Sequence, residues 1–307
     1  MFGSKRGVIA AGVLVAGASL LLAGCSSSAS LSGGGSTTKK TSIVVGSANF
    51  SENVVLADIY GQALAENGFA VTYKLNIGAR AAYIPALESG EVNLIPEYSG
   101  SILDFLSKSA TANSPSDVKA ALDAALPSTL KALTPSTAAD SDSLNVTPAF
   151  ASTNNLTSIA DLAKLSSVTL AANPEFQTRP DGIPGLQKVY GLTNLKFQSI
   201  SDGGGPQTLA ALLGGQVQVA DIYSTTPSIL ANKLVSLTDP KSLFASQEVV
   251  PIVSSSKVNA KLTSVLNKVS AALTTKDLLE LNTEVQGDSK TDPAVAAKNW
   301  LKKANLF

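Results

Sequence analysis

Tyr98 and Tyr223 end two similar stretches in the two halves of the chain. Each follows the order helix, glycine turn and strand, in the segments LESGEVNLIPEYSG and LLGGQVQVADIYSTT. Ligands of open α/β sheets bind at the carboxyl ends of the strands, so a tyrosine at each strand end predicts an aromatic half-site in each half of the fold. Two such half-sites would face each other across a cleft. The alternative is that the similarity of the two segments reflects only the ordinary repetition of α/β units.

Several classes of enzyme are excluded because the chain lacks the residue types that they need. The chain has no histidine and one cysteine, Cys25. Catalysis by a histidine base, a Ser-His-Asp triad or a Cys-His nucleophile is therefore excluded, as is zinc held by histidines or several cysteines. Carboxylate pairs and Ser-Lys dyads stay open, although no spacing favours either. We expect a binding protein without cofactor or metal, and a surface enzyme that uses carboxylates is the remote alternative.

Alternating strand and helix patterns must position the two tyrosines. Because strands alternate with helices, we expect parallel pairing and an α/β fold. Short β-branched runs predict strands at 42–47, 70–75, 92–95, 168–172, 195–200 and 217–223. Apolar periodicity predicts helices from an N-cap at Ser51 to a stop at Asn67-Gly68, and at 82–89, 182–190, 207–213, 262–273, 275–285 and 293–303.

The N-terminal segment differs from the rest of the chain. Lys5 and Arg6 precede an apolar run, residues 8–22, that is shorter than the ~20 residues a membrane-spanning helix needs. A basic start, a short apolar run and small residues after it describe a secretory signal, which we place at residues 1–24. The alternative is an uncleaved membrane helix.

Cys25 follows the signal directly, in the sequence LAGC. This sequence resembles the lipobox of bacterial lipoproteins, which implies cleavage before Cys25 and lipidation of its thiol. Residues 25–41 are rich in serine and glycine and predict a flexible linker. The implied location is the outer face of the cytoplasmic membrane, anchored by lipid, and a Gram-positive-type envelope fits it.

Composition describes the remainder as globular. The chain is 44% hydrophobic and 15% charged, and its 23 basic residues balance 23 acidic ones. No basic stripe is present for nucleic-acid binding. We expect a monomer that binds a small molecule.

Several segments resemble one family closely. They are GSANFSENVVLADIYGQAL, NIGARAAYIPALESGEVNLIPEYSGSIL, PEFQTRPDGIPGLQKVYGL, ADIYSTTPSI and LNTEVQGDSKTDPAVAAKNWL. Together they look like the substrate-binding proteins of osmoprotectant ABC importers, which bind glycine betaine, choline or carnitine. The resemblance covers about residues 43–305. It implies a periplasmic-binding-protein type II fold, capture of an osmoprotectant such as glycine betaine, and delivery to an ABC permease with its ATPase.

The same fold implies two lobes that the chain enters and leaves through a hinge. We assign 42–145 and 250–307 to lobe I and 146–249 to lobe II. The predicted crossings lie near Asn145 and near Val249-Val250-Pro251.

The resemblance also implies roles for particular residues. A quaternary ammonium has no N–H to donate, so aromatic rings hold it by cation–π contact. Tyr98 and Tyr223 match tyrosines that form the family's aromatic box around the cation, one from each lobe. Arg179 matches the arginine that binds the ligand's carboxylate. Ser101 takes the place of a ligand-contacting threonine. The structural alternatives are core or hinge tyrosines, an Arg179 salt bridge with Asp181 or Glu175, and Ser101 as a helix cap.

Three positions depart from the family pattern. Ala48 stands where many members carry a lysine that helps to hold the carboxylate. Phe150, two residues after Pro148, and Gln247 stand where two further box tyrosines are usual. Two of four rings and one of two cations are therefore missing.

Other side chains could compensate or change the ligand. Arg80 lies at a strand end near the predicted cleft and could replace the missing cation, unless it is a solvated loop charge. Asn49, Gln247 and Thr225 complete the predicted ligand contacts and make the cleft more polar. A more polar or larger ligand, such as a polyol or polyphenol, is the alternative to a quaternary amine.

Overall fold

The computed structural model describes residues 41–307. The predicted signal sequence, Cys25 and the linker up to residue 40 lie outside the described residues. Within 41–307, no helix combines the length and the apolar character that a membrane crossing requires.

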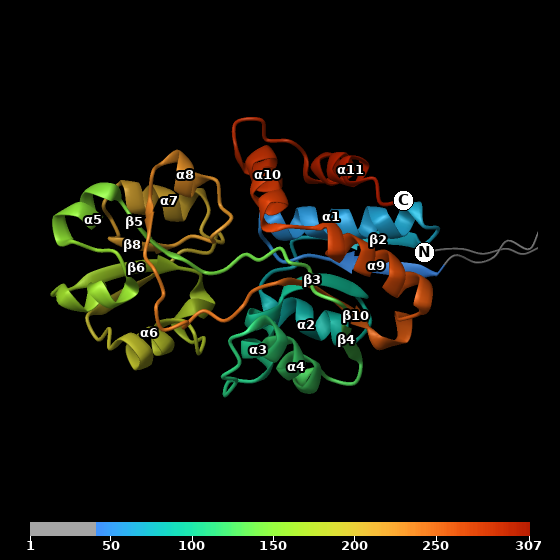
Figure 1. The fold of residues 1–307 in the computed structure, drawn as a ribbon, viewed down its shortest axis with the longest axis horizontal. Coiled ribbons are helices and arrows are strands. Elements are labelled where there is room, and N and C mark those ends of the chain that lie inside the picture. Colours follow the sequence, from blue (N-terminus) through green and yellow to red (C-terminus); the bar gives the residue numbers. More distant parts are fainter. Residues whose placement is uncertain (1–40) are drawn as a thin grey trace, which may run out of the picture. The chain divides into compact units, whose positions relative to one another are not determined.

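The first of two sheets has the strand order β2-β1-β3-β10-β4. Strands β1 and β2 pair in parallel, as do β1 and β3, whereas β10 runs antiparallel to both β3 and β4. The strands are β1 (Ser42–Gly46), β2 (Ala70–Lys74), β3 (Leu94–Tyr98), β4 (Leu130–Ala132) and β10 (Val249–Ser254). The predicted parallel pairing is confirmed for the first three strands, and the last two are return strands (Figure 1).

The second sheet repeats this plan with the order β7-β6-β8-β5-β9. Strand β6 pairs in parallel with β7 and β8, and β5 runs antiparallel to β8 and β9. The strands are β5 (Leu144–Val146), β6 (Val168–Ala172), β7 (Leu195–Ser199), β8 (Val219–Asp221) and β9 (Val235–Ser236). Both sheets therefore place a tyrosine at the carboxyl end of their central strand. Tyr98 is the last residue of β3, and Tyr223 follows β8 by two residues.

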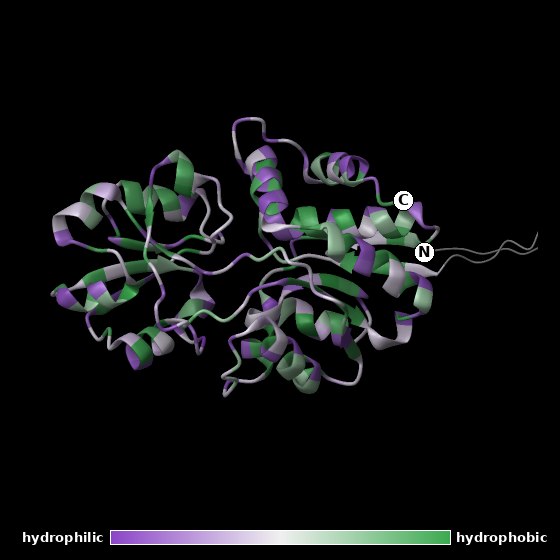
Figure 2. Ribbon diagram, viewed as in Figure 1, coloured by the Kyte–Doolittle hydropathy of each residue, from purple (hydrophilic) through white to green (hydrophobic). Residues whose placement is uncertain are grey.

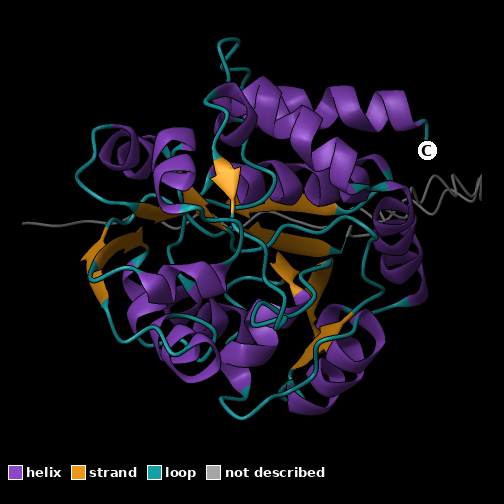
Figure 3. Ribbon diagram, turned by 60° about the vertical axis from the view of Figure 1, so that its left-hand side comes forward, coloured by secondary structure: helices purple, strands orange, loops and turns teal. Residues whose placement is uncertain are grey.

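Helices flank the strands of both sheets (Figure 3). In lobe I they are α1 (Ser51–Glu66), α2 (Arg80–Glu88), α3 (Ser99–Leu106), α4 (Pro115–Ala125), α9 (Ala260–Ala272), α10 (Thr275–Gln286) and α11 (Pro293–Ala304). In lobe II they are α5 (Pro148–Asn154), α6 (Ile183–Tyr190), α7 (Pro206–Leu213) and α8 (Ser228–Ala231), with short 3-10 turns at Ile159–Lys164 and Pro174–Gln177; a third such turn, Ser255–Lys257, follows β10.

Each sheet has its own hydrophobic core. Helix α1 lies over the first sheet, and α9, α10 and α11 pack against it. The chain's one tryptophan, Trp300 of α11, is buried in this cluster. A separate cluster around Leu170 and Phe176 fills lobe II. Apolar residues accordingly concentrate on the strands and on α1 (Figure 2).

Two chain segments connect the lobes and run beside each other. Ala139 and Glu248 form an antiparallel bridge, and the backbone N–H of Asp140 donates to the carbonyl oxygen of Gln247. Because β5 pairs within the second sheet, the first crossing precedes Leu144 rather than following Asn145. The residue ranges that we assign to the two lobes stay a prediction. The pairing of β5 would place the boundary between the lobes a few residues earlier in the chain.

Candidate functional site

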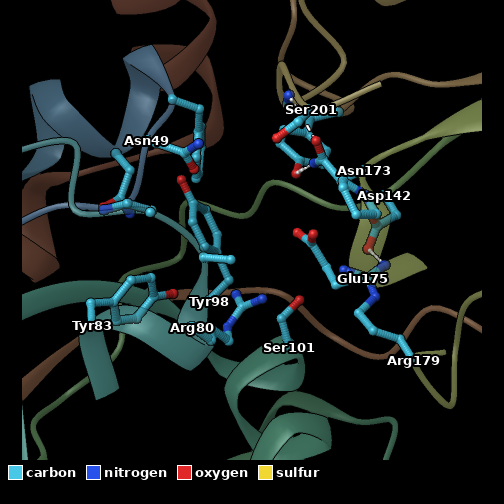
Figure 4. A pocket seen from close by; sticks show the side chains of 18 of the residues that line it. Asn49, Arg80, Tyr83, Tyr98, Ser101, Asp142, Asn173, Glu175, Arg179 and Ser201 are labelled. Atoms are coloured by element: carbon cyan, nitrogen blue, oxygen red, sulfur yellow. Dashed lines mark hydrogen bonds and ion pairs between the residues drawn. The ribbon is translucent and has the colours of Figure 1, made fainter. Parts of the chain in front are cut away.

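A cavity of about 290 Å³ lies where the ends of β1 and β3 face lobe II. Of the nine residues predicted to contact a ligand, seven line it: Ala48, Asn49, Arg80, Tyr98, Ser101, Arg179 and Tyr223. The other two, Gln247 and Thr225, are buried outside its lining. Figure 4 shows residues of both lobes around the open space, with Tyr98 and Arg80 on one side and Asp142, Glu175 and Arg179 on the other.

Three aromatic rings meet at the cavity. The ring centroids of Phe50 and Tyr98 are 6.0 Å apart, and those of Phe50 and Tyr223 are 5.5 Å apart in an edge-to-face arrangement. Both separations fall in the range of favourable aromatic pairs. Phe50 therefore joins the two predicted tyrosines, although the sequence pattern gave it no role.

Backbone geometry allows Phe50 to reach lobe II. Phe50 is the N-cap of α1 in extended conformation, and Ser51 is the first helical residue, so the predicted capping role of Ser51 is wrong. Opposite lies Gly203 with φ +66°, where an added Cβ would stand 3.1 Å from the Phe50 Cβ. A side chain at position 203 would both strain the backbone and crowd the ring.

Buried Glu52 links the aromatic cluster to Thr225 of lobe II and to α10. Its carboxylate accepts hydrogen bonds from the Tyr98 hydroxyl (2.6 Å), the Thr225 hydroxyl (2.6 Å) and the Asn282 amide (2.5 Å). Burial raises the pKa of Glu52, and these donors oppose the rise. Thr225, predicted as a ligand contact, is engaged here in holding the lobes together.

Asp140 of the first crossing supports the same contact. One of its oxygens accepts from the Ser224 hydroxyl and from the backbone N–H of Thr225, both at 3.0 Å. Burial and the neighbouring Glu52 raise the pKa of Asp140 well above its usual range. Thr225 is thus held by two buried carboxyl groups.

Arg80 lies on the cavity wall with its guanidinium already paired. Its Nε and Nη2 donate to the carboxylate of Glu97 at 3.0 to 3.3 Å, and the Tyr83 hydroxyl donates to the same carboxylate at 2.7 Å. Burial lowers the pKa of Arg80, and the charge of Glu97 outweighs it, so the pKa is raised. The alternative of a solvated loop charge does not fit this burial.

Arg179 is paired in the same way on the lobe II side. Its Nη2 donates to Asp142 at 2.7 Å, its Nε lies 3.1 Å from Asp181, and its guanidinium stacks over Phe176. The structural alternative of an Arg179–Asp181 pair is present, although it is buried rather than on the surface. Burial and the nearby Asp142 raise the pKa of Asp221 well above its usual range.

Within residues 41–307, no acidic cluster has the arrangement of a metal site.

Four of the remaining predicted residues, Ala48, Ser101, Gln247 and Tyr223, have structural partners. The backbone N–H of Ala48 donates to the Asn53 amide oxygen at 2.7 Å. Gln247, 1% exposed, accepts from the backbone N–H of Ser101 at 2.9 Å and so secures α3 to the second crossing. On the lobe II side, the Asn173 amide donates to the Tyr223 hydroxyl at 2.9 Å. Ligand contact by any of these residues stays a prediction.

Comparison with known proteins assigns the family. Residues 41–303 match the model of the substrate-binding domain of ABC-type glycine betaine transport systems. The chain belongs to this family. Its predicted membership among osmoprotectant-binding proteins of ABC importers is confirmed, and its relatives are transport binding proteins rather than enzymes.

Individual relatives agree with this assignment. The glycine betaine-binding protein YehZ of Escherichia coli K12 is 29% identical over 280 residues, which cover 85% of this chain and 92% of YehZ. The apo structure of YehZ superposes with a TM-score of 0.62 at 26% identity, covering 86% of this chain and 99% of that one. The crystal structure of a glycine betaine/carnitine/choline ABC transporter reaches a TM-score of 0.69 at 23% identity, with coverages of 87% and 99%. These likenesses confirm the periplasmic-binding-protein type II fold.

Proposed function

We propose that this chain captures a quaternary-amine osmoprotectant in the cavity between its lobes and delivers it to the permease of an ABC importer. The aromatic cluster of Phe50, Tyr98 and Tyr223 carries the proposal. Cation–π contact with such rings is the main specific attraction available to an ammonium that has no N–H. The compounds in the names of the family and its relatives, glycine betaine, choline and carnitine, all contain this group.

The polyol or polyphenol alternative is not favoured. Two missing tyrosines and a missing lysine are the grounds for it, and the family assignment favours a quaternary amine instead. Phe50 supplies a third ring beside Tyr98 and Tyr223.

The proposal includes the membrane anchor and the location. Cleavage before Cys25 and lipidation of its thiol would tether a monomer to the outer face of the cytoplasmic membrane. One acyl chain binds a membrane only marginally, so the anchor requires more than one. Mass spectrometry of the membrane fraction should find the mature N-terminus at Cys25 with a lipid; an unmodified, unprocessed chain there would refute this part.

Ligand binding is the direct test of the proposed function. We expect at least one of choline, glycine betaine and carnitine to give saturable binding in calorimetry and to raise the midpoint of thermal unfolding. A ligand at 100 times its dissociation constant adds about 2.7 kcal/mol to stability. Binding of a polyol or polyphenol with no response to any quaternary amine would refute the proposal.

A further inference from the structure

Both cationic side chains of the cavity are already neutralised by carboxylates. Arg80 is paired with Glu97 through two nitrogens, and Arg179 with Asp142 and Asp181. Their side chains are only 18% and 16% exposed. A ligand carboxylate that accepted from the remaining N–H groups would meet a cation whose charge an acid already balances, so the attraction would be weak.

Glu175 is a cavity residue with a free carboxylate. It follows β6 in the 3-10 turn Pro174–Gln177, on the lobe II side. Figure 4 shows its carboxylate pointing into the open space, toward the side that carries Tyr98. Among the interactions of residues 41–307, no hydrogen bond or ion pair engages this carboxylate.

Glu175 lines the same cavity as the three rings of the aromatic cluster. Burial, Asp142 and Asp221 raise the pKa of Tyr223 well above its usual range; Arg179 opposes the rise, and Glu175 adds a smaller contribution to it. An ammonium held at these rings would therefore share the cavity with the Glu175 carboxylate, which attracts it.

The charged groups at the cavity sum to a negative charge, which has the same sign as the charge of Glu175. Two arginines line it, together with the acids Asp140, Asp142 and Glu175, and the arginines' partners Glu97 and Asp181 add further carboxylates. Counting only Glu97, Asp142 and Glu175 as charged, the negative groups outnumber the two guanidinium groups. Such a cavity attracts cations and repels anionic groups.

We infer that Glu175 makes this cleft selective for monocationic quaternary amines that carry a hydroxyl, such as choline, over zwitterions that carry a carboxylate, such as glycine betaine. The inference rests on the proposed function and narrows it. Choline and glycine betaine share the trimethylammonium group and differ at the other end of a short chain. Their ratio of affinities therefore isolates the cost of a ligand carboxylate.

Calorimetric titration of the purified chain with three ligands tests the inference. They are choline, glycine betaine, and the neutral carbon isostere of choline in which a tert-butyl group replaces the trimethylammonium. We expect choline to bind about tenfold or more tightly than glycine betaine, as one charge interaction of about 1.4 kcal/mol predicts. In Glu175→Gln, choline should lose about tenfold in affinity, and the isostere should be unaffected.

A matched control removes the same charge away from the cleft. Glu66 is exposed at the far end of α1, and Glu66→Gln should leave all three affinities unchanged. Tighter binding of glycine betaine than of choline, or an unchanged ratio of the two in Glu175→Gln, overturns the inference and leaves the proposed function intact. If no quaternary amine binds the wild-type chain, the proposed function itself fails.

Discussion

Single residues decide what the cleft can bind, and Phe50 shows why some of them escape sequence analysis. Tyr98 and Tyr223 could be found because each follows a strand in a repeated pattern, and the structure places both at the cavity. Phe50 lies before a helix, where no periodic pattern distinguishes a ring directed at a ligand from one directed into the core. Gln247 and Thr225 come from segments near the crossings, and the direction of their side chains depends on how the lobes meet.

Removal of the Phe50 ring tests its place in the aromatic cluster. Phe50→Ala should weaken binding of a quaternary amine by about 1.4 kcal/mol, or about tenfold, because one cation–π contact is lost. Calorimetry gives the affinity. Phe307→Ala removes a half-exposed ring at the C-terminus and serves as the control. Equal affinities for Phe50→Ala and the wild type would remove Phe50 from the site.

At the scale of elements, the first turn of α1 joins the two lobes. Glu52 lies in this turn and contacts β3 through Tyr98, lobe II through Thr225 and α10 through Asn282. The bounds of α1 and of the C-terminal helices can be predicted closely, because their apolar periodicity is local information. The contact of α10 with Glu52 cannot be predicted in this way, because it joins residues 230 positions apart.

Thr225→Val tests this connection. The substitution keeps the shape of the side chain and removes one donor from the buried Glu52 carboxylate, so we expect the free energy of unfolding to fall by about 1–3 kcal/mol. Urea denaturation measures it. Thr111→Val, at an exposed loop position, should change it by less than about 0.5 kcal/mol. A loss no larger than that of the control would show that the hydrogen bond contributes nothing.

For the whole molecule, acids concentrated at the cleft make stability depend on pH. Burial, with help from Asp181 of lobe II, raises the pKa of Asp104 in α3 to about 7, against the opposing charges of Arg179, Arg80 and Lys108. The unfolded chain releases this proton near the ordinary value of 3.8. The folded state therefore binds more protons between these values, and stability decreases as the pH rises through that interval.

Asp104→Asn should reduce this pH dependence. The amide cannot ionise, so the decrease in the free energy of unfolding between about pH 5 and pH 8 should become smaller than in the wild type. Urea denaturation at both pH values measures the difference. Asp288→Asn changes an exposed acid and should leave the decrease unaltered. An identical decrease in Asp104→Asn would contradict the raised pKa.

The position of Trp300 determines which optical signals can follow these experiments. This side chain is 6% exposed in the core of lobe I, where α11 packs on α1, and it is the only indole in the chain. Its fluorescence will report the melting of lobe I. Binding of a ligand beside Phe50 and Tyr223 would hardly change that emission. A fluorescence assay of ligand binding therefore needs a new fluorophore placed at the rim of lobe II.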